Sequence, residues 1–104
     1  MTRLIDDNLS EIRQLCERFG VERLDLFGSA TTEAFGDRSD VDFVVRFRPL
    51  ENPRPGEHFD RYFGLLDGLK ALFQRDVDLV EGNALRNPYL IRQIEASRSR
   101  LYAA

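Results

Sequence analysis

The apolar residues of the chain recur with two periods, about 3.6 residues and about 2 residues, and this alternation predicts helices separated by short strands. Helical spacing covers residues 7–19, and Gly20 follows where a helix commonly ends in glycine. A second helix is expected over residues 59–73, and a third after the Asn87-Pro88 cap. The apolar positions behind these helices are Leu9, Ile12, Leu15, Cys16 and Phe19, then Phe59, Tyr62, Phe63, Leu66, Leu69 and Phe73, and for the last helix Leu90, Ile91, Ile94 and Leu101.

Strand-like segments lie between the predicted helices. Residues 21–27 read as a strand that ends directly at the Gly28-Ser29 turn, and a short helical piece is expected over residues 30–35. Two further strands are expected at residues 40–46 and 76–80. The order helix, strand, short helix, strand, helix, strand, helix predicts a small α/β sandwich, of the α+β kind, with three or four strands.

The last two predicted strands carry nearly the same pentapeptide, DVDFV from residue 40 and DVDLV from residue 76. Because side chains alternate along a strand, Asp40 and Asp42 leave the same face. If the second acidic strand lies next to the first, roughly 4.8 Å away, Asp78 stands beside that pair. Carboxylates this close repel one another unless they bind a cation, and such oxygen ligands suit Mg²⁺ or Mn²⁺. Asp76 starts its strand and is expected to face water, so Asp78 is the predicted third ligand.

The Gly28-Ser29 turn is a candidate phosphate site. Gly28 permits close backbone approach or a positive φ, and Ser29 can cap the short helix while its hydroxyl faces an anion. Taken alone, the turn is an ordinary N-cap and the Asp-x-Asp pattern a solvated strand face. Together they favour two divalent ions, about 4 Å apart, that clamp a triphosphate and an attacking hydroxyl. The third carboxylate could accept the hydroxyl proton, and which group acts as the base stays open.

The bulk composition is that of one ordinary globular domain spanning residues 1–104, with 42% hydrophobic and 32% charged residues. A net charge of -3 argues against nonspecific binding to nucleic acid through a basic surface. Cys16 is the only cysteine, so an internal disulfide is excluded and a reducing, cytoplasmic location is expected. No apolar run approaches the roughly 20 residues of a membrane span, so no membrane partner is expected.

The turn and the two acidic strands, read together, resemble a known signature. Gly28-Ser29, SDVDFVV from residue 39 and VDLV from residue 77 are similar to the motifs of the minimal nucleotidyltransferases of the DNA polymerase beta superfamily. The resemblance spans nearly the whole chain and implies a nucleotidyltransferase-like sandwich with helices packed on a mixed sheet. It implies that Asp40 and Asp42 bind both magnesium ions, that Asp78 is the third carboxylate, and that Gly28 and Ser29 hold the phosphates of ATP or another nucleoside triphosphate.

The resemblance also implies an activity and a partner. Members of this family transfer a nucleoside monophosphate from a nucleoside triphosphate to a hydroxyl, here expected to be AMP from ATP. Many small members resemble antitoxins that bind a helical HEPN-type ribonuclease toxin, and some adenylylate that toxin on tyrosine. A chain of 104 residues has little material for an acceptor domain, so the acceptor hydroxyl is expected on a partner protein. Whether the chain forms homo- or hetero-oligomers is left open.

One departure from the family pattern concerns the residues after the turn. The chain reads Ala30-Thr31-Thr32-Glu33, which puts Thr32 and Glu33 where arginine and glycine are usual. A carboxylate near a triphosphate is unfavourable unless it points away, so catalysis is expected to be weakened. Arg38 could replace the missing cation, and its alternative role is a surface arginine. His58, near the start of a helix, is interpreted as polar surface without a role.

This departure keeps two other functions open. The chain could be a binding module that neutralises a partner by occlusion after losing efficient catalysis, or a sensor that binds a nucleotide or metal without transfer. Loss of protection on substitution of Asp40 and Asp42 would favour an enzyme over occlusion. Tight ATP binding without any product would indicate a sensor.

Overall fold

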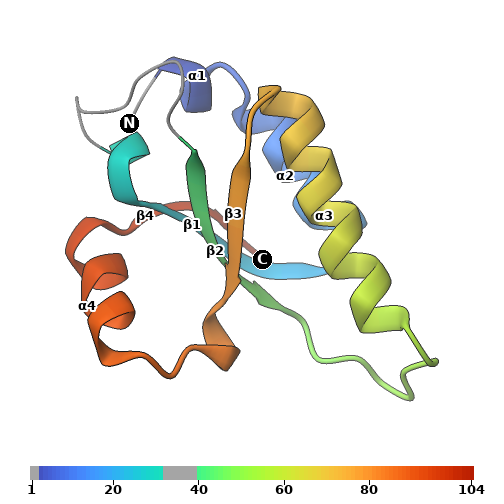
Figure 1. The fold of residues 1–104 in the computed structure, drawn as a ribbon. Helices are drawn as coiled ribbons and strands as arrows, with labels where there is room; N and C mark the ends of the chain where they lie inside the picture. Colours follow the sequence, from blue (N-terminus) through green and yellow to red (C-terminus); the bar gives the residue numbers. More distant parts are fainter. Residues whose placement is uncertain (1–2, 32–39) are drawn as a thin grey trace.

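The computed structural model of the protein describes residues 3–31 and 40–104, apart from the side chains at positions 29 and 30. Four strands of the described chain form one sheet in the order β3-β2-β1-β4 (Figure 1). The helices are α1 (Arg3–Asp6), α2 (Leu9–Arg18), α3 (Glu57–Phe73) and α4 (Pro88–Ser97); the strands are β1 (Val21–Phe27), β2 (Val41–Phe47), β3 (Val77–Glu81) and β4 (Ser99–Ala103); and the 3₁₀ turns are η1 (Gly28–Thr31) and η2 (Gly82–Ala84).

The sheet is mixed, as the family resemblance implies. Strands β2 and β3 are parallel, whereas β1 runs antiparallel to its two neighbours, β2 and β4. The carboxyl end of β1 therefore lies beside the first residues of β2 and β3. We call this part of the sheet the acidic end, and it is defined by Gly28, Asp40, Asp42 and Asp78.

Helices α2 and α3 cover one face of the sheet, and α4 covers the other (Figure 1). In β2 the side chains alternate accordingly, with Phe43 in the large core under α2 and α3 and Val44 in the smaller core under α4. Glycines let α2 and α3 pack closely, because a Cβ atom on Gly68 would lie 2.6 Å from the side chain of Leu15. Cys16 is fully buried in the large core, as expected for a small apolar side chain, and burial raises its pKa to about 12.

The predicted helix ends agree with the structure at two places. Gly20, just after α2, has a φ of 70°, which is the left-handed conformation that ends many helices. Asn87 caps α4, since its Oδ1 atom accepts a hydrogen bond of 2.9 Å from the backbone N–H of Tyr89. No helix of the described chain has the length and apolar content needed to cross a membrane.

The prediction for the end of the chain was wrong. Leu101 does not continue the last helix, because α4 ends at Ser97 and residues Ser99–Ala103 form strand β4 against β1. The reason is that the free side of β1 offers backbone groups that only an extended segment can pair. The short helical piece expected over residues 30–35 is partly present as η1, and positions 32–39 lie outside the described residues.

Candidate active site at the acidic end of the sheet

Asp42 and Asp78 stand side by side at the acidic end. They are register partners in the parallel pair β2 and β3, so their side chains leave the same face of the sheet. This is the face covered by α4, because Val44 and Val80, two residues further along each strand, pack in the smaller core. The strand pairing expected from the repeated pentapeptide is therefore confirmed.

The glycine turn touches the same carboxylate. Phe27, the last residue of β1, is the register partner of Asp42, and Gly28 follows with a φ of 77°. A Cβ atom on Gly28 would lie 2.5 Å from the Oδ2 atom of Asp42, closer than real side chains approach. Glycine is thus required at this position for two reasons, the left-handed backbone and the contact with the carboxylate.

The electrostatics of the acidic end are unfavourable for a carboxylate. The pKa of Asp42 is raised from an ordinary 3.8 to about 6, first by burial and then by the negative charges of Asp78 and Asp40. The three carboxylates therefore interact, with Asp42 the innermost of them. Asp40 and Asp78 are both exposed.

A divalent metal fits the chemistry of these side chains. They offer only oxygen donors, and a cation would relieve the repulsion that disfavours the ionised form of Asp42. Among residues 3–31 and 40–104, however, no three His, Cys, Asp or Glu side chains are gathered closely enough to hold a metal ion. The acidic end therefore consists of the strand-paired Asp42 and Asp78 with Asp40 nearby, and the side chains of Asp40 and Asp78 are exposed to solvent.

Several predicted phosphate-side residues fall outside what the structure describes: the side chain of Ser29, and Thr32, Glu33 and Arg38. The backbone of Gly28 is described, and its N–H donates a hydrogen bond of 3.0 Å to the Oγ atom of Ser97 at the end of α4. This amide is consequently occupied within the chain.

The geometry of the acidic end agrees with a family comparison. Residues 9–101 match the family described as nucleotidyltransferase domain. The chain belongs to this family. Two relatives from Methanocaldococcus jannaschii are both named putative protein adenylyltransferase. MJ0128 is 35% identical over 81 residues, which are 78% of this chain and 76% of the relative. MJ1379 is 30% identical over 95 residues, covering 84% of this chain and 91% of the relative.

Solved structures share the fold of this nucleotidyltransferase. A mutant of the toxin–antitoxin pair MntA–HpeT matches with a TM-score of 0.70 at 21% identity, over 93% of this chain and 74% of that chain. A tri-AMPylated HEPN toxin of Shewanella oneidensis with its MNT antitoxin matches with a TM-score of 0.64 at 22% identity, over 95% and 72%. A structure named putative minimal nucleotidyltransferase gives 0.63 at 25% identity, over 91% and 90%. The fold class expected from the sequence is confirmed.

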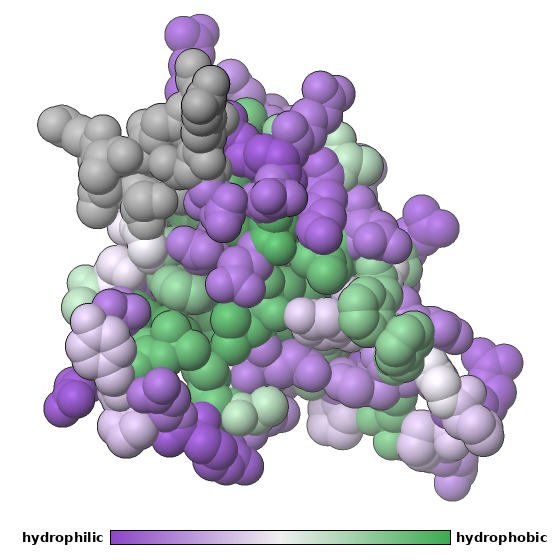
Figure 2. Space-filling model, in the orientation of Figure 1, coloured by the Kyte–Doolittle hydropathy of each residue, from purple (hydrophilic) through white to green (hydrophobic). Residues whose placement is uncertain are grey.

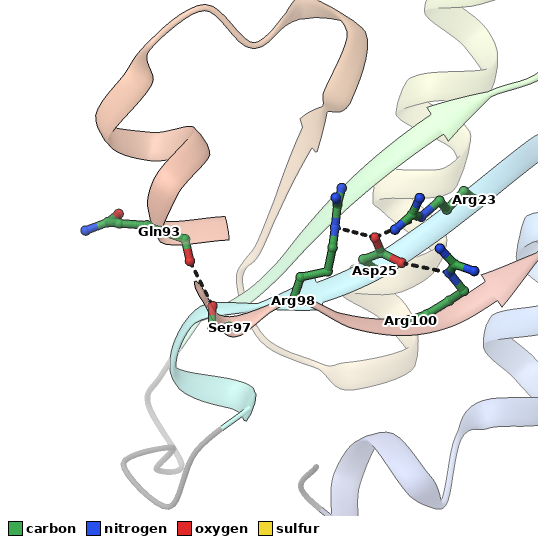
Figure 3. Close-up of polar contacts among 6 residues, drawn as sticks. All are labelled: Arg23, Asp25, Gln93, Ser97, Arg98 and Arg100. Carbon is green, nitrogen blue, oxygen red and sulfur yellow. Dashed lines mark hydrogen bonds and ion pairs between the residues drawn. The ribbon is translucent and has the colours of Figure 1, made fainter. Parts of the chain in front are cut away.

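A charge cluster around a buried aspartate lies on the same face of the sheet as the acidic end, and it is not among the residues singled out from the sequence. Asp25 of the nucleotidyltransferase is fully buried, and one of its oxygens, Oδ2, lies 2.5 Å from Nε of Arg98 and 3.0 Å from Nε of Arg23 (Figure 3). The other oxygen, Oδ1, is 3.9 Å from Nε of Arg100. The available signal was an aspartate between Leu24 and Leu26, within an otherwise apolar strand.

The cavity next to α4 and the side chain of His58 both lie away from the acidic end. Hydrophilic atoms gather around the upper part of the sheet, where β2 and β3 begin, and apolar surface lies below them (Figure 2). A cavity of about 210 Å³ between the sheet and α4 is bordered by Asp25 and Ile94 and does not include the carboxylates of the acidic end. His58 lies at the other end of β3, where its Nε2 atom is 2.8 Å from Glu81. It is thus distant from the candidate site.

Proposed function

We propose that this nucleotidyltransferase transfers AMP from ATP to a hydroxyl of a partner protein, as the antitoxin-like member of a toxin–antitoxin pair in the cytoplasm. One observation carries the proposal: Asp42 and Asp78 are register partners beside the Gly28 turn, in a chain of this family. The names of the relatives support adenylyl transfer to protein. The names of the solved structures, which include a toxin–antitoxin pair with AMP-PNP and an AMPylated HEPN toxin, support the nucleotide and the partner.

The proposed roles follow the acidic end. Asp42 and Asp78, the strand-paired couple, would hold Mg²⁺, or Mn²⁺, with Asp40 nearby as the third carboxylate, and the turn at Gly28 and Ser29 would face the phosphates. When bound, the metal would neutralise the carboxylates and the triphosphate and so reduce the repulsion between them. Burial and neighbouring negative charge raise the pKa of Asp42 and so disfavour its ionised form. This is consistent with a carboxylate that binds a cation.

The reaction requires one bond to form and one to break. The oxygen of the acceptor hydroxyl bonds to the α-phosphorus of ATP, and the bond from that phosphorus to the pyrophosphate oxygen breaks. The hydroxyl proton passes to a base, and pyrophosphate leaves with the electron pair of the broken bond. Asp40, Asp42 and Asp78 are the carboxylates of the site available for this proton.

The acceptor is proposed to come from another molecule. The described chain uses its helices to cover the sheet, and the acidic end stays open to solvent at Asp40 and Asp78. We treat residues 1–104 as one catalytic domain that a partner completes by presenting its hydroxyl. A helical protein encoded next to this chain is the first candidate for the partner.

The test is transfer of label from ATP labelled at the α-phosphate to the candidate partner, with magnesium present. Wild-type protein should label the partner, and Asp42→Asn should reduce the rate by at least about 100-fold. Asp67→Asn is the matched control, because Asp67 is exposed on α3 and has no charged partner among the described residues. Undiminished labelling by Asp42→Asn would overturn the proposed site.

A second function is favoured by the Thr32 and Glu33 departure. In that case the chain neutralises its partner by occlusion, and transfer is lost or weak. Coexpression separates the two functions: if Asp40→Asn and Asp42→Asn together leave protection from the toxin unchanged, occlusion is correct. If protection disappears while the complex still forms, modification is correct.

A further inference from the structure

The end of α4 is joined directly to the glycine turn. The Oγ atom of Ser97 accepts the hydrogen bond of 3.0 Å from the N–H of Gly28 and donates one of 3.1 Å to the backbone carbonyl of Gln93. Both hydrogen-bonding functions of the hydroxyl are therefore engaged. The donor to Gln93 fixes the rotamer, so the acceptor lone pair faces Gly28 in one orientation.

The next residue ties the same segment to the strand that delivers the turn. Arg98 pairs with Asp25, which precedes Gly28 by three residues in β1 (Figure 3). Strand β4 then continues the attachment, with Ser99 in register with Leu26. Ser97 thus lies between its helix and a segment that is anchored to β1 by the ion pair of Arg98 with the buried Asp25 and by strand pairing.

We propose that Ser97 is a positioning residue of the nucleotidyltransferase, which holds Gly28 in the left-handed conformation that aims the turn at the triphosphate. This inference rests on the proposed function. The argument is that a left-handed glycine has many alternatives in the absence of a constraint, because glycine populates both signs of φ readily. The hydrogen bond from Ser97 selects one of them, the conformation in which the α-carbon of Gly28 lies against the carboxylate of Asp42.

The hydrogen bond also determines which amides can meet a phosphate. Since the N–H of Gly28 is occupied by Ser97, the anion must use donors further along the turn. Without the Ser97 hydroxyl, the N–H of Gly28 has no hydrogen-bond partner in a partly buried position. Backbone conformations that turn this N–H toward another acceptor are then favoured. The cost then appears as weaker nucleotide binding, in addition to any loss of stability.

Three substitutions separate positioning from general stability. Ser97→Ala removes the hydroxyl, and Ser97→Thr restores it. Ser99→Ala is the matched control, since Ser99 lies two residues away in β4 and its hydroxyl makes no hydrogen bond within the described chain. Ile94→Val controls for a looser α4, because Ile94 is buried between that helix and the sheet and its truncation costs some stability while leaving the Ser97 hydroxyl in place.

Two measurements are made on these proteins. Amide hydrogen exchange at Gly28, followed by NMR, should accelerate by about tenfold or more in Ser97→Ala and return to the wild-type rate in Ser97→Thr. Binding of ATP with magnesium, measured by calorimetry, should weaken about five- to tenfold in Ser97→Ala and recover in Ser97→Thr. Ser99→Ala and Ile94→Val should keep both values close to wild type.

Each alternative result has a separate meaning. Unchanged exchange at Gly28 in Ser97→Ala overturns the inference, and so does an equal loss of ATP affinity in Ile94→Val. A wild-type chain that binds no ATP overturns the proposed function instead. In that event the exchange rate of Gly28 still decides whether Ser97 holds the turn.

Discussion

A Cβ atom on Gly28 would lie 2.5 Å from the Oδ2 atom of Asp42, so the turn after β1 meets the first acidic strand at a glycine, where no side chain is in the way. Gly28→Ala should therefore be costly in two ways. Its φ of 77° is strained for alanine, and the new methyl group collides with the carboxylate. We expect the free energy of unfolding to fall by about 2–4 kcal/mol, measured by urea denaturation.

Gly56 provides the matched control for this substitution. Its φ is 79°, nearly that of Gly28, but a Cβ atom there would meet nothing within 4 Å. Gly56→Ala should therefore lose only the backbone contribution, about 1 kcal/mol. Equal losses for the two variants would mean that the contact with Asp42 has no energetic weight.

The raised pKa of Asp42 predicts a pH dependence of stability. With a pKa of about 6 when folded and an ordinary 3.8 when unfolded, the folded protein keeps a proton that the unfolded chain has released. The contribution of Asp42 to stability therefore falls as the pH rises from about 4 to about 6, and it stays low above that range. At pH 7 without metal, Asp42→Asn should raise the free energy of unfolding by about 1 kcal/mol, after allowance for solvent screening.

This gain should disappear below about pH 4, where the wild-type carboxyl is protonated in both states. Thermal unfolding at a series of pH values measures the difference between variant and wild type. Asp67→Asn, on the exposed surface of α3, should show no comparable pH-dependent gain. A variant at position 42 that is less stable at pH 7 would contradict the repulsion inferred at the acidic end.

Magnesium should act against the same repulsion. If Asp42 and Asp78 hold the metal, its addition at pH 7 should raise the melting temperature of the wild type. At a magnesium concentration about tenfold above Kd, the free energy of unfolding should rise by about 1.4 kcal/mol. Asp42→Asn and Asp78→Asn should lose most of this response, and potassium chloride at matched ionic strength should not reproduce it. A full response in both variants would place the metal elsewhere.

The strands and the acidic pairing were predictable because their signals are local. Alternating side chains put Asp40 and Asp42 on one face, and the repeated pentapeptide suggested that Asp78 lies beside them. What the pattern leaves open is the register, because a shift by two residues would preserve the same faces. The structure supplies it, by pairing Asp42 with Asp78. The functional roles of these aspartates stay predictions.

Strand β4 and the Asp25 cluster were missed for a related reason. Leu101 follows Ile94 by seven residues, which matches two turns of a helix, so periodicity favours the wrong element. Arg98 and Arg100 are two residues apart and lie on one face only in an extended chain. That they both approach Asp25 becomes apparent once β4 is paired with β1, a contact between distant parts of the sequence.

The last prediction concerns the ion pair between Arg98 and the buried Asp25, which holds β4 to β1. Arg98→Gln removes the guanidinium whose Nε lies 2.5 Å from Asp25, a residue with no exposed surface, and Arg23 at 3.0 Å is left as the near partner. We expect the free energy of unfolding to fall by about 1–3 kcal/mol, since a buried carboxylate loses much of its compensation. Arg92→Gln, on the exposed side of α4, should change it by less than about 0.5 kcal/mol. Because Asp25 is shielded from solvent, urea unfolding in high salt should preserve the difference, whereas a difference abolished by salt would indicate an ordinary surface ion pair.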